Sequence, residues 1–175
     1  MAIDVTLAAE ADLTELADVA ARTFPLACPP SSTPDDIAAF VEENLSEARF
    51  REYLADPDRA VLVARDASIL GYAMVIRGEP DDPDVQRAVE LRPAVEVSKL
   101  YVSPDSHGAG VSAALMIAAV QQAEQFGARA VWLGVNQQNH RAQRFYAKHG
   151  FSVTGTKTFQ LGEAMENDYV MVRTV

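Results

Sequence analysis

Cysteine is nearly absent from this sequence, since Cys28 is the only one among 175 residues. A single cysteine excludes an internal disulfide and any zinc site built from several cysteines. Basic residues are also scarce, with 15 Lys and Arg against 25 Asp and Glu, which gives a formal net charge of −10. This balance argues against a nucleic-acid-binding protein, which usually presents a basic face. It is compatible with a cationic partner.

Long apolar runs and a basic leader are missing as well. No apolar stretch reaches the length of about 18 residues that a membrane-spanning helix needs. The first 16 residues carry four acidic residues and no Lys or Arg, so no secretory signal is evident. We therefore expect no membrane span and a cytoplasmic location. The length and the 49% hydrophobic content suit one domain over residues 1–175.

Hydrophobic periodicity and turn residues predict alternating strands and helices. Helices are predicted over residues 13–21, ending before Phe24 and Pro25, then from residue 34, over 48–54, from 111 to about 126, and over 139–149. Strands are predicted at 3–7, as a hairpin at 60–64 and 69–76, and at 95–102, 130–135, 151–156 and 169–173. Residues 78–93 contain three prolines and several acids and are expected to form an exposed excursion with one helical turn, and 158–168 a strand plus a turn.

The most informative stretch runs from residue 95 to residue 120 and is expected to form a strand, a tight turn and a helix. Small residues stand where this helix begins, in the order His107-Gly108-Ala109-Gly110-Val111-Ser112. The first amides of a helix have no internal partner, and the helix dipole is positive at that end. The sequence therefore predicts a cradle for an anion, with a pyrophosphate as the favoured ligand.

Two better-known phosphate motifs do not fit this turn. Gly108 and Gly110 lack the third spaced glycine of a dinucleotide-binding fingerprint, and no Gly-Lys-Ser/Thr follows as in a P-loop. A glycine-containing strand-to-helix turn also occurs as a plain connection, and the residues alone leave that reading open.

Two motifs in the second half of the chain resemble the GNAT superfamily of N-acetyltransferases. The first is Leu100-Tyr101-Val102-Ser103-Pro104 followed by residues 107–112 and Leu115, and the second is Asn139, Ala142, Phe145-Tyr146, Lys148 and Gly150-Phe151. The motifs cover residues 95–151, and the first half matches in layout only. His107 stands where the family usually has Gln or Arg, and Ser112 where it has a last glycine. A finer likeness, to PaiA-type polyamine acetyltransferases, involves residues 96–102, 132–135 and 159–162 with Asp168, and also residues 23–25 and the helix from Pro34.

This resemblance implies an α/β fold with a mixed, mostly antiparallel sheet of six to seven strands flanked by helices and splayed at the central strands. It implies transfer of an acetyl group from acetyl-CoA to a primary amine, with a small amine or polyamine as the acceptor. It implies no metal, and relatives that often dimerise suggest a homodimer. Two alternatives stay open, which are acetylation of a protein lysine or N-terminus, and a CoA-binding sensor without turnover.

The resemblance also assigns residues to the co-substrate. The amides of residues 108–113 would hold the pyrophosphate, the edge of the strand at 100–102 would pair with the pantetheine arm, and an amide near Val102 would face the thioester oxyanion. The residues expected to bind acetyl-CoA are Leu100, Tyr101, Val102, His107, Gly108, Ala109, Gly110, Val111, Ser112, Ala113, Asn139, Ala142 and Tyr146. A phenol can protonate a departing thiolate, and Tyr146 holds the family position for this general acid.

A base must take the proton of the acceptor amine, because an alkylamine titrates near ~10.4 and is mostly protonated at neutral pH. Glu96 is the candidate, with a solvated or salt-bridged strand residue as the alternative. Gly134 stands where some relatives have an acid on the following strand, which suggests that this route is closed. Glu163, Glu166 and Asp168 are reserve candidates for holding a cationic substrate, although a charge run beside a turn favours plain surface.

Three other features are expected to be structural. His107, His140 and His149 lack the spacing of a metal site, and the last two are expected on an exposed helix face. Trp132 is expected in the core, and Cys28 as a passive thiol in its proline-rich loop.

Overall fold

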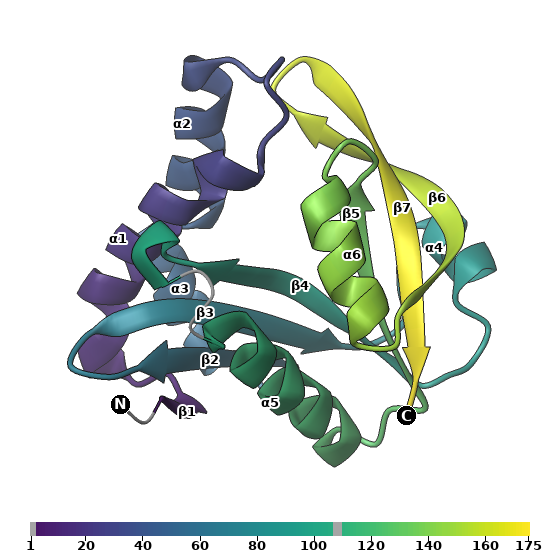
Figure 1. Cartoon of the computed structure of the whole chain (residues 1–175), viewed down its shortest axis with the longest axis horizontal. Coiled ribbons are helices and arrows are strands. Elements are labelled where there is room, and N and C mark those ends of the chain that lie inside the picture. Colours follow the sequence, from purple (N-terminus) through teal and green to yellow (C-terminus); the bar gives the residue numbers. More distant parts are fainter. Residues whose placement is uncertain (1–2, 107–109) are drawn as a thin grey trace.

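A single seven-stranded sheet organises the chain (Figure 1). The computed structural model describes residues 3–106 and 110–175, so the predictions at His107, Gly108 and Ala109 lie outside the described residues. The strand order is β1-β2-β3-β4-β5-β7-β6, and every neighbouring pair is antiparallel except β4 with β5. The strands are β1 (Asp4–Leu7), β2 (Arg59–Arg65), β3 (Ile69–Arg77), β4 (Ala94–Val102), β5 (Ala130–Asn136), β6 (Ser152–Leu161) and β7 (Ala164–Thr174). The expected mixed, mostly antiparallel α/β sheet is therefore confirmed.

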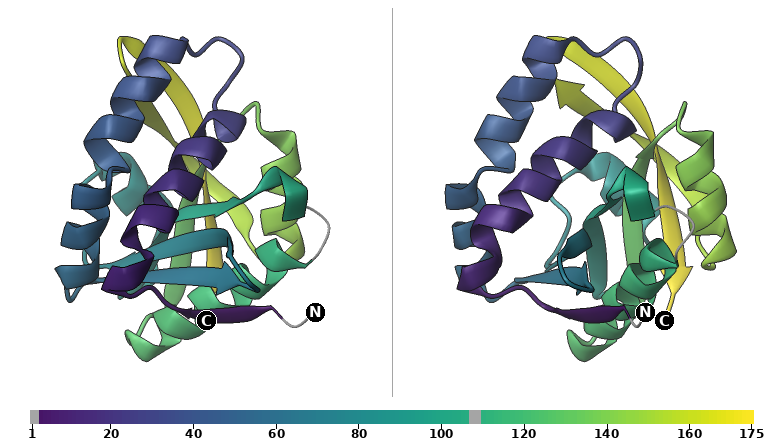
Figure 2. Two further views of the ribbon diagram at one scale, coloured as in Figure 1. Left: turned by 90° about the vertical axis from the view of Figure 1, so that its left-hand side faces the viewer. Right: turned by 60° about the vertical axis from the view of Figure 1, so that its left-hand side comes forward.

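Helices cover both faces of this sheet (Figures 1 and 2). They are α1 (Leu13–Ala27), α2 (Pro34–Asn44), α3 (Glu47–Ala55), α4 (Pro83–Ala88), α5 (Val111–Gln125) and α6 (His140–Lys148), with 3-10 turns η1 (Glu10–Asp12) and η2 (Pro104–Ser106). Side chains of α1 and α3 form one buried cluster with one face of β2 and β3, and α5 forms another with the opposite face. None of the helices in the described ranges is long and apolar enough to cross a bilayer.

The central strands separate along their length, as expected. Residues 94–96 of β4 pair with residues 130–132 of β5, and the register between the two strands goes no further. β4 continues to Val102 along β3, while β5 continues to Asn136 along β7. The two halves of the sheet therefore diverge beyond Glu96, and a wedge opens between them.

A β-bulge in β4 sits at the start of this wedge. Met74 of β3 is opposite Lys99, and the next residue, Val75, is opposite Val97, so Ser98 is the extra residue. Strand residues normally alternate between faces, and a bulge resets that alternation. Glu96, Lys99 and Tyr101 therefore share the face that carries α1 and α3, because their partners Ile76, Met74 and Tyr72 all belong to that cluster.

Helix α1 runs past the point where the sequence predicted its end. It continues to Ala27 and includes Pro25. Proline cannot donate to the carbonyl one turn earlier, so the prediction ended the helix before it. The ring of Phe24 stacks on Phe40 of α2 with centroids 4.5 Å apart, and only 6% of Phe24 is exposed. This burial favours the extra turn.

Residues 78–93 contain the expected helical turn as α4, but the segment is not the wholly exposed excursion that its composition predicted. Val85 and Val89 are fully buried at α4, where they join Trp132 of β5 and Val170 of β7 in a third cluster. The composition hid this because the apolar residues lie between exposed acids and prolines. Trp132 is a core residue, as expected. β6 joins the strand predicted at 151–156 to residues 158–161, and the chain turns at Gly162 into β7, which begins at Ala164 and not at the predicted residue 169.

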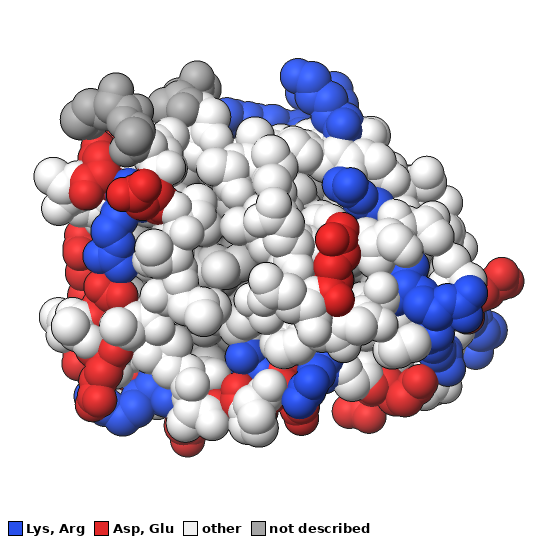
Figure 3. All heavy atoms as spheres, turned by 90° about the horizontal axis from the view of Figure 1, so that it is seen from below, with Lys and Arg blue, Asp and Glu red and all other residues white. Residues whose placement is uncertain are grey.

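The face formed by α5 and β1 carries little charge at its centre (Figure 3). Helix α5 has Glu124 as its one charged residue. The acidic residues that give the chain its net charge of −10 therefore lie mainly elsewhere.

Gly71 lets β3 approach the end of β4 closely, and we expect Gly71→Ala to destabilise the protein. A Cβ at this position would lie 2.7 Å from the carbonyl oxygen of Tyr101 and 3.1 Å from Cα of Val102, both of which are backbone atoms. Such overpacking costs about 1–3 kcal/mol, which would appear as a lower urea midpoint at unchanged slope. The exposed Ser152→Ala is the matched surface control, and equal midpoints for both variants would contradict the assigned close contact.

Candidate active site

A cavity of about 290 Å³ lies where β4 leaves β5. This volume is at the lower end of the range of about 300–1,000 Å³ that is typical of small-molecule sites. Residues from the sheet and from α1, α2 and α6 surround it. The lining residues with polar or ionisable side chains are Cys28, Glu96, Ser98, Lys99, Tyr101, Asn136, Asn139, Tyr146, Lys157, Glu166 and Asp168.

Glu96 lies at the last residue of β4 that still pairs with β5. Burial raises the pKa of its carboxyl group, while Lys157, Lys99 and Arg59 oppose that shift in decreasing order. A carboxylate with a raised pKa is a better proton acceptor than one in water. The structure thus brings Glu96 into the cavity, and the reading of a solvated strand residue does not fit.

Lys99 lines the same cavity and was not among the predicted site residues. Burial lowers the pKa of its ammonium group to about 8, with Arg59 adding to the shift and Glu96 opposing it. A lysine inside an otherwise apolar central strand, three residues after an acid, was the signal in the sequence. Strict alternation would have placed the two on opposite faces, and the bulge at Ser98 brings them to one face.

The far wall of the cavity carries an ion pair between neighbouring strands. Nζ of Lys157 on β6 lies 3.6 Å from Oδ2 of Asp168 on β7, and both side chains are largely buried. Gly134 of β5 makes room for them, because a Cβ there would lie 2.6 Å from Cε of Lys157. The sequence offers no acid on β5, because Gly134 stands there. The space beside Gly134 is instead occupied by the carboxylate of Asp168, which comes from the neighbouring strand β7.

Of the three acids near the end of the chain, Glu166 and Asp168 line the cavity and Glu163 lies at the surface. The surface reading is wrong for Asp168, which is only 8% exposed and whose pKa is raised by burial against the opposing Lys157. Glu166 is half-buried and lines the cavity, whereas Glu163 is exposed in the turn and does not. The register between β6 and β7 decides which of these acids reach the cavity and which stay at the surface, and the sequence does not reveal that register.

Helix α6 and its cap bring three predicted residues to the cavity, Asn139, Ala142 and Tyr146. Asn139 caps the helix, because its side-chain oxygen accepts a hydrogen bond of 3.1 Å from the amide of Ala142. Tyr146 lies two turns further on, and its ring contacts Phe145 and Phe151. Burial raises the pKa of the Tyr146 phenol to about 12, so the group stays protonated at neutral pH and can donate a proton.

The start of α5 suits an anion as the sequence predicts. Gly110 precedes the helix with a φ of 81°, and the first helical hydrogen bond runs from the amide of Ala114 to its carbonyl oxygen at 3.0 Å. The amides of Val111, Ser112 and Ala113 belong to the first turn, which has no carbonyl partners within the helix. No side chain caps this end, so a phosphate fits the described part of the turn.

The remaining predicted residues lie at the end of β4 and in the loop after α1. Leu100 and Tyr101 line the cavity, and Val102 is paired with Gly71 of β3. Cys28 also lines the cavity, where its thiol donates to the carbonyl oxygen of Phe24 at 3.4 Å. Burial raises the pKa of this thiol to about 11, which suits the expected passive role.

Comparison with known proteins identifies the family. The sequence profile of the acetyltransferase (GNAT) family matches residues 15–151. The chain belongs to the GNAT family of acetyltransferases. It is 60% identical over 163 residues to uncharacterized N-acetyltransferases of Mycobacterium tuberculosis and Mycobacterium bovis, which covers 93% of this chain and 97% of each relative. As a GNAT protein it is an N-acetyltransferase with acetyl-CoA as its co-substrate.

Solved structures share the GNAT fold over the whole chain. A PaiA N-acetyltransferase from Thermoplasma acidophilum in complex with coenzyme A superimposes with a TM-score of 0.78 at 19% identity and covers 100% of both chains. Ard1 from Thermoplasma volcanium gives a TM-score of 0.71, also at 19% identity, and covers 100% of this chain and 99% of that one. At these identities the likeness establishes the fold and leaves the acceptor of this GNAT enzyme to its own residues.

Proposed function

We propose that this protein transfers the acetyl group of acetyl-CoA directly to the primary amine of a small molecule bound in the cavity between β4 and β5. The observation that carries this proposal is that the wedge of the sheet leads into a cavity holding both a buried carboxylate, Glu96, and a protonated phenol, Tyr146. Direct transfer needs both groups, because the amine must lose a proton and the leaving thiolate must gain one.

The co-substrate fits the two ends of the wedge. The first amides of α5, with Gly110 before them, would hold the pyrophosphate, and the free edge of β4 at Leu100 and Tyr101 would lie along the pantetheine arm. Asn139 would hold the start of α6 beside that arm. Acetyl-CoA supplies the acetyl group as a thioester.

The residues of the cavity would then divide the proton transfers between them. Glu96 would accept the proton of the amine, directly or through one water, as the C–N bond forms at the thioester carbon. Tyr146 would donate its phenolic proton to sulfur as the C–S bond breaks. The burial of Glu96 and Tyr146 favours this step, because an uncharged amine and a neutral phenol are both easier to keep in a site with little water.

A polyamine is the second candidate acceptor, and the cavity offers one observation in its favour. Glu96, Glu166 and Asp168 place three carboxylates on the lining, which would attract a cation. Lys99 and Lys157 line the same cavity and oppose a polycation, so we propose a small amine as the general class.

The test measures free thiol release from acetyl-CoA over a panel of small amines, spermidine and a lysine-containing peptide, with CoA affinity measured in parallel. We expect turnover on one or more small amines at micromolar to millimolar KM. Turnover on the peptide alone would favour a protein acceptor. CoA binding without turnover on any amine would favour the sensor, and no CoA binding would contradict the proposed cradle.

A further inference from the structure

The charges around the cavity are more mixed than those of the chain as a whole, which is strongly acidic. Three carboxylates and two ammonium groups line it, in a protein with a net charge of −10. One of the ammonium groups is already neutralised, since Lys157 pairs with Asp168 at 3.6 Å and the two side chains are 15% and 12% exposed. The other ammonium group, that of Lys99, is in a different situation.

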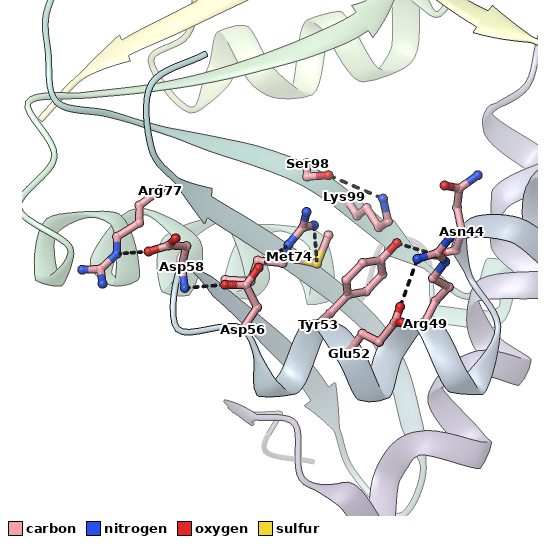
Figure 4. A network of polar contacts seen from close by, with 11 residues as sticks. Asn44, Arg49, Glu52, Tyr53, Asp56, Asp58, Met74, Arg77, Ser98 and Lys99 are labelled. Atoms are coloured by element: carbon pink, nitrogen blue, oxygen red, sulfur yellow. Dashed lines mark hydrogen bonds and ion pairs between the residues drawn. The ribbon is translucent and has the colours of Figure 1, made fainter. Parts of the chain in front are cut away.

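Lys99 has no carboxylate partner among the residues that the structure describes. Its Nζ is 3.5 Å from the hydroxyl oxygen of the neighbouring Ser98, and 5.9 Å from the ring centroid of Tyr53 on α3. Tyr53 donates its own hydroxyl to the carbonyl oxygen of Asn44. Figure 4 shows the ammonium group of Lys99 beside this ring. Glu96 acts on this ammonium group from a longer distance, because it opposes the lowering of the Lys99 pKa, but no carboxylate of the described residues forms an ion pair with Lys99.

No ion pair with a described residue offsets the cost of burying the ammonium group of Lys99. The guanidinium of Arg59 also lies over the ring of Tyr53, 4.8 Å from its centroid, but this group is paired with Asp56 at 3.1 Å. A cation removed from water without a counter-ion is destabilised, and an anion brought by a ligand restores the balance. The cavity is thus suited to an acceptor that carries its own negative charge.

The bulge in β4 places the two charges that such an acceptor needs on one face. Glu96 and Lys99 both project from the face that carries α1 and α3, on either side of Ser98. The acceptor amine would lie toward Glu96, and an anionic group on the same molecule would lie toward Lys99. A molecule that carries an amine and a carboxylate close to each other could present one group to each of these residues.

Part of the cavity lining is aromatic. Phe24 stacks on Phe40 at 4.5 Å, and Phe159 meets Phe40 edge-on with centroids 5.6 Å apart. All three residues line the cavity. This part of the lining suits the apolar side chain of a ligand better than the hydrated chain of a polycation.

We propose that the acceptor is a zwitterionic small molecule with an apolar side chain, of the chemical class of an α-amino acid, and that Lys99 binds its carboxylate. The proposal rests on the acetyltransferase function and narrows its acceptor class. Lys99 is then the specificity-determining residue of the site, since it favours the amino acid over the corresponding amine.

The test compares matched acceptors that differ in the carboxylate alone, L-phenylalanine with 2-phenylethylamine and L-leucine with 3-methylbutylamine, alongside spermidine. We expect kcat/KM of the amino acid to exceed that of its amine by at least about tenfold, because the amine would leave a buried charge unpaired. In Lys99→Gln the KM of the amino acid should rise until that preference is lost, while KM of the amine stays the same. Lys148→Gln, at an exposed position of α6 outside the cavity, is the matched control.

Binding of L-phenylalanine to the CoA-loaded protein, measured by calorimetry, gives a readout that does not need turnover. If Lys99→Gln loses this binding, the result supports the proposed acceptor class. If in addition no acceptor is acetylated, only the proposed acetyl transfer fails. Acetylation of amines or spermidine without preference for amino acids overturns the acceptor class and leaves the enzymatic proposal standing. An equal loss for both members of a pair in Lys99→Gln would show a structural role and also overturns it.

Discussion

Replacing Tyr146 with Phe is expected to lower kcat for acetyl transfer by at least about tenfold, since general acids contribute about 10²–10⁴-fold. The ring stays, so the contacts with Phe145 and Phe151 are kept, and CoA affinity should change by less than about twofold. The departing thiolate would lose its proton donor and would have to take a proton from water. Thiol release and equilibrium CoA binding, measured side by side, separate the two effects.

The pH dependence of wild-type activity gives a second test of the role of Tyr146. A general acid works in its protonated form, and burial raises the pKa of Tyr146 to about 12, so wild-type activity should not fall because of this group below that pH. Tyr169→Phe is the control, because Tyr169 packs on the same core and does not line the cavity. Equal kcat in Tyr146→Phe and in the control would remove Tyr146 from the chemistry.

Glu96→Gln is expected to have the larger effect, a loss of about 10²-fold or more in kcat/KM at neutral pH. The amide is close in size and cannot accept the proton of the amine. Burial raises the pKa of Glu96, so the proton-accepting form is lost as pH falls through a value above the usual carboxyl range. The acidic limb of the wild-type profile should carry this ionisation and should be missing from the variant.

Two further variants make the assignment of Glu96 specific. Glu163→Gln removes a carboxylate from the exposed turn and should retain wild-type activity. Asp168→Asn removes the other buried carboxylate of the cavity, which the nearby Lys157 holds in an ion pair. If Asp168→Asn removes the acidic limb and Glu96→Gln does not, the base is Asp168.

Local patterns in the sequence predict the parts of the site that local structure determines. The helix cap at Asn139, the glycine before α5 and the strand that carries Glu96 follow from neighbouring residues, and the structure has each of them. The place of Tyr146 in the cavity came from the family motif. These elements depend on few distant contacts.

The parts that the sequence missed depend on pairing between distant segments. Lys157 and Asp168 reach the cavity because β7 lies between β5 and β6, an order that periodicity does not show. Lys99 joins them through a bulge, which shifts the face of every later residue in β4. The burial of Val85 likewise follows from where α4 docks. In each case the local composition favoured a surface or a regular strand.

The bulge at Ser98 also separates two tasks that share one strand. Positions 96, 99 and 101 project from the face that carries α1 and α3, and the side chains at 97, 100 and 102 pack on the core beneath α5. Acceptor preference can therefore be redesigned at the first set without disturbing the packing that the second set maintains. A deletion of Ser98 would only remove the bulge, since Lys99 would stay opposite Met74, whereas an insertion of one residue after Lys99 would exchange the later positions and turn Tyr101 toward α5. Evolution of new acceptors in this scaffold is thus free to substitute residues along β4 but not to change the number of residues between Lys99 and Val102.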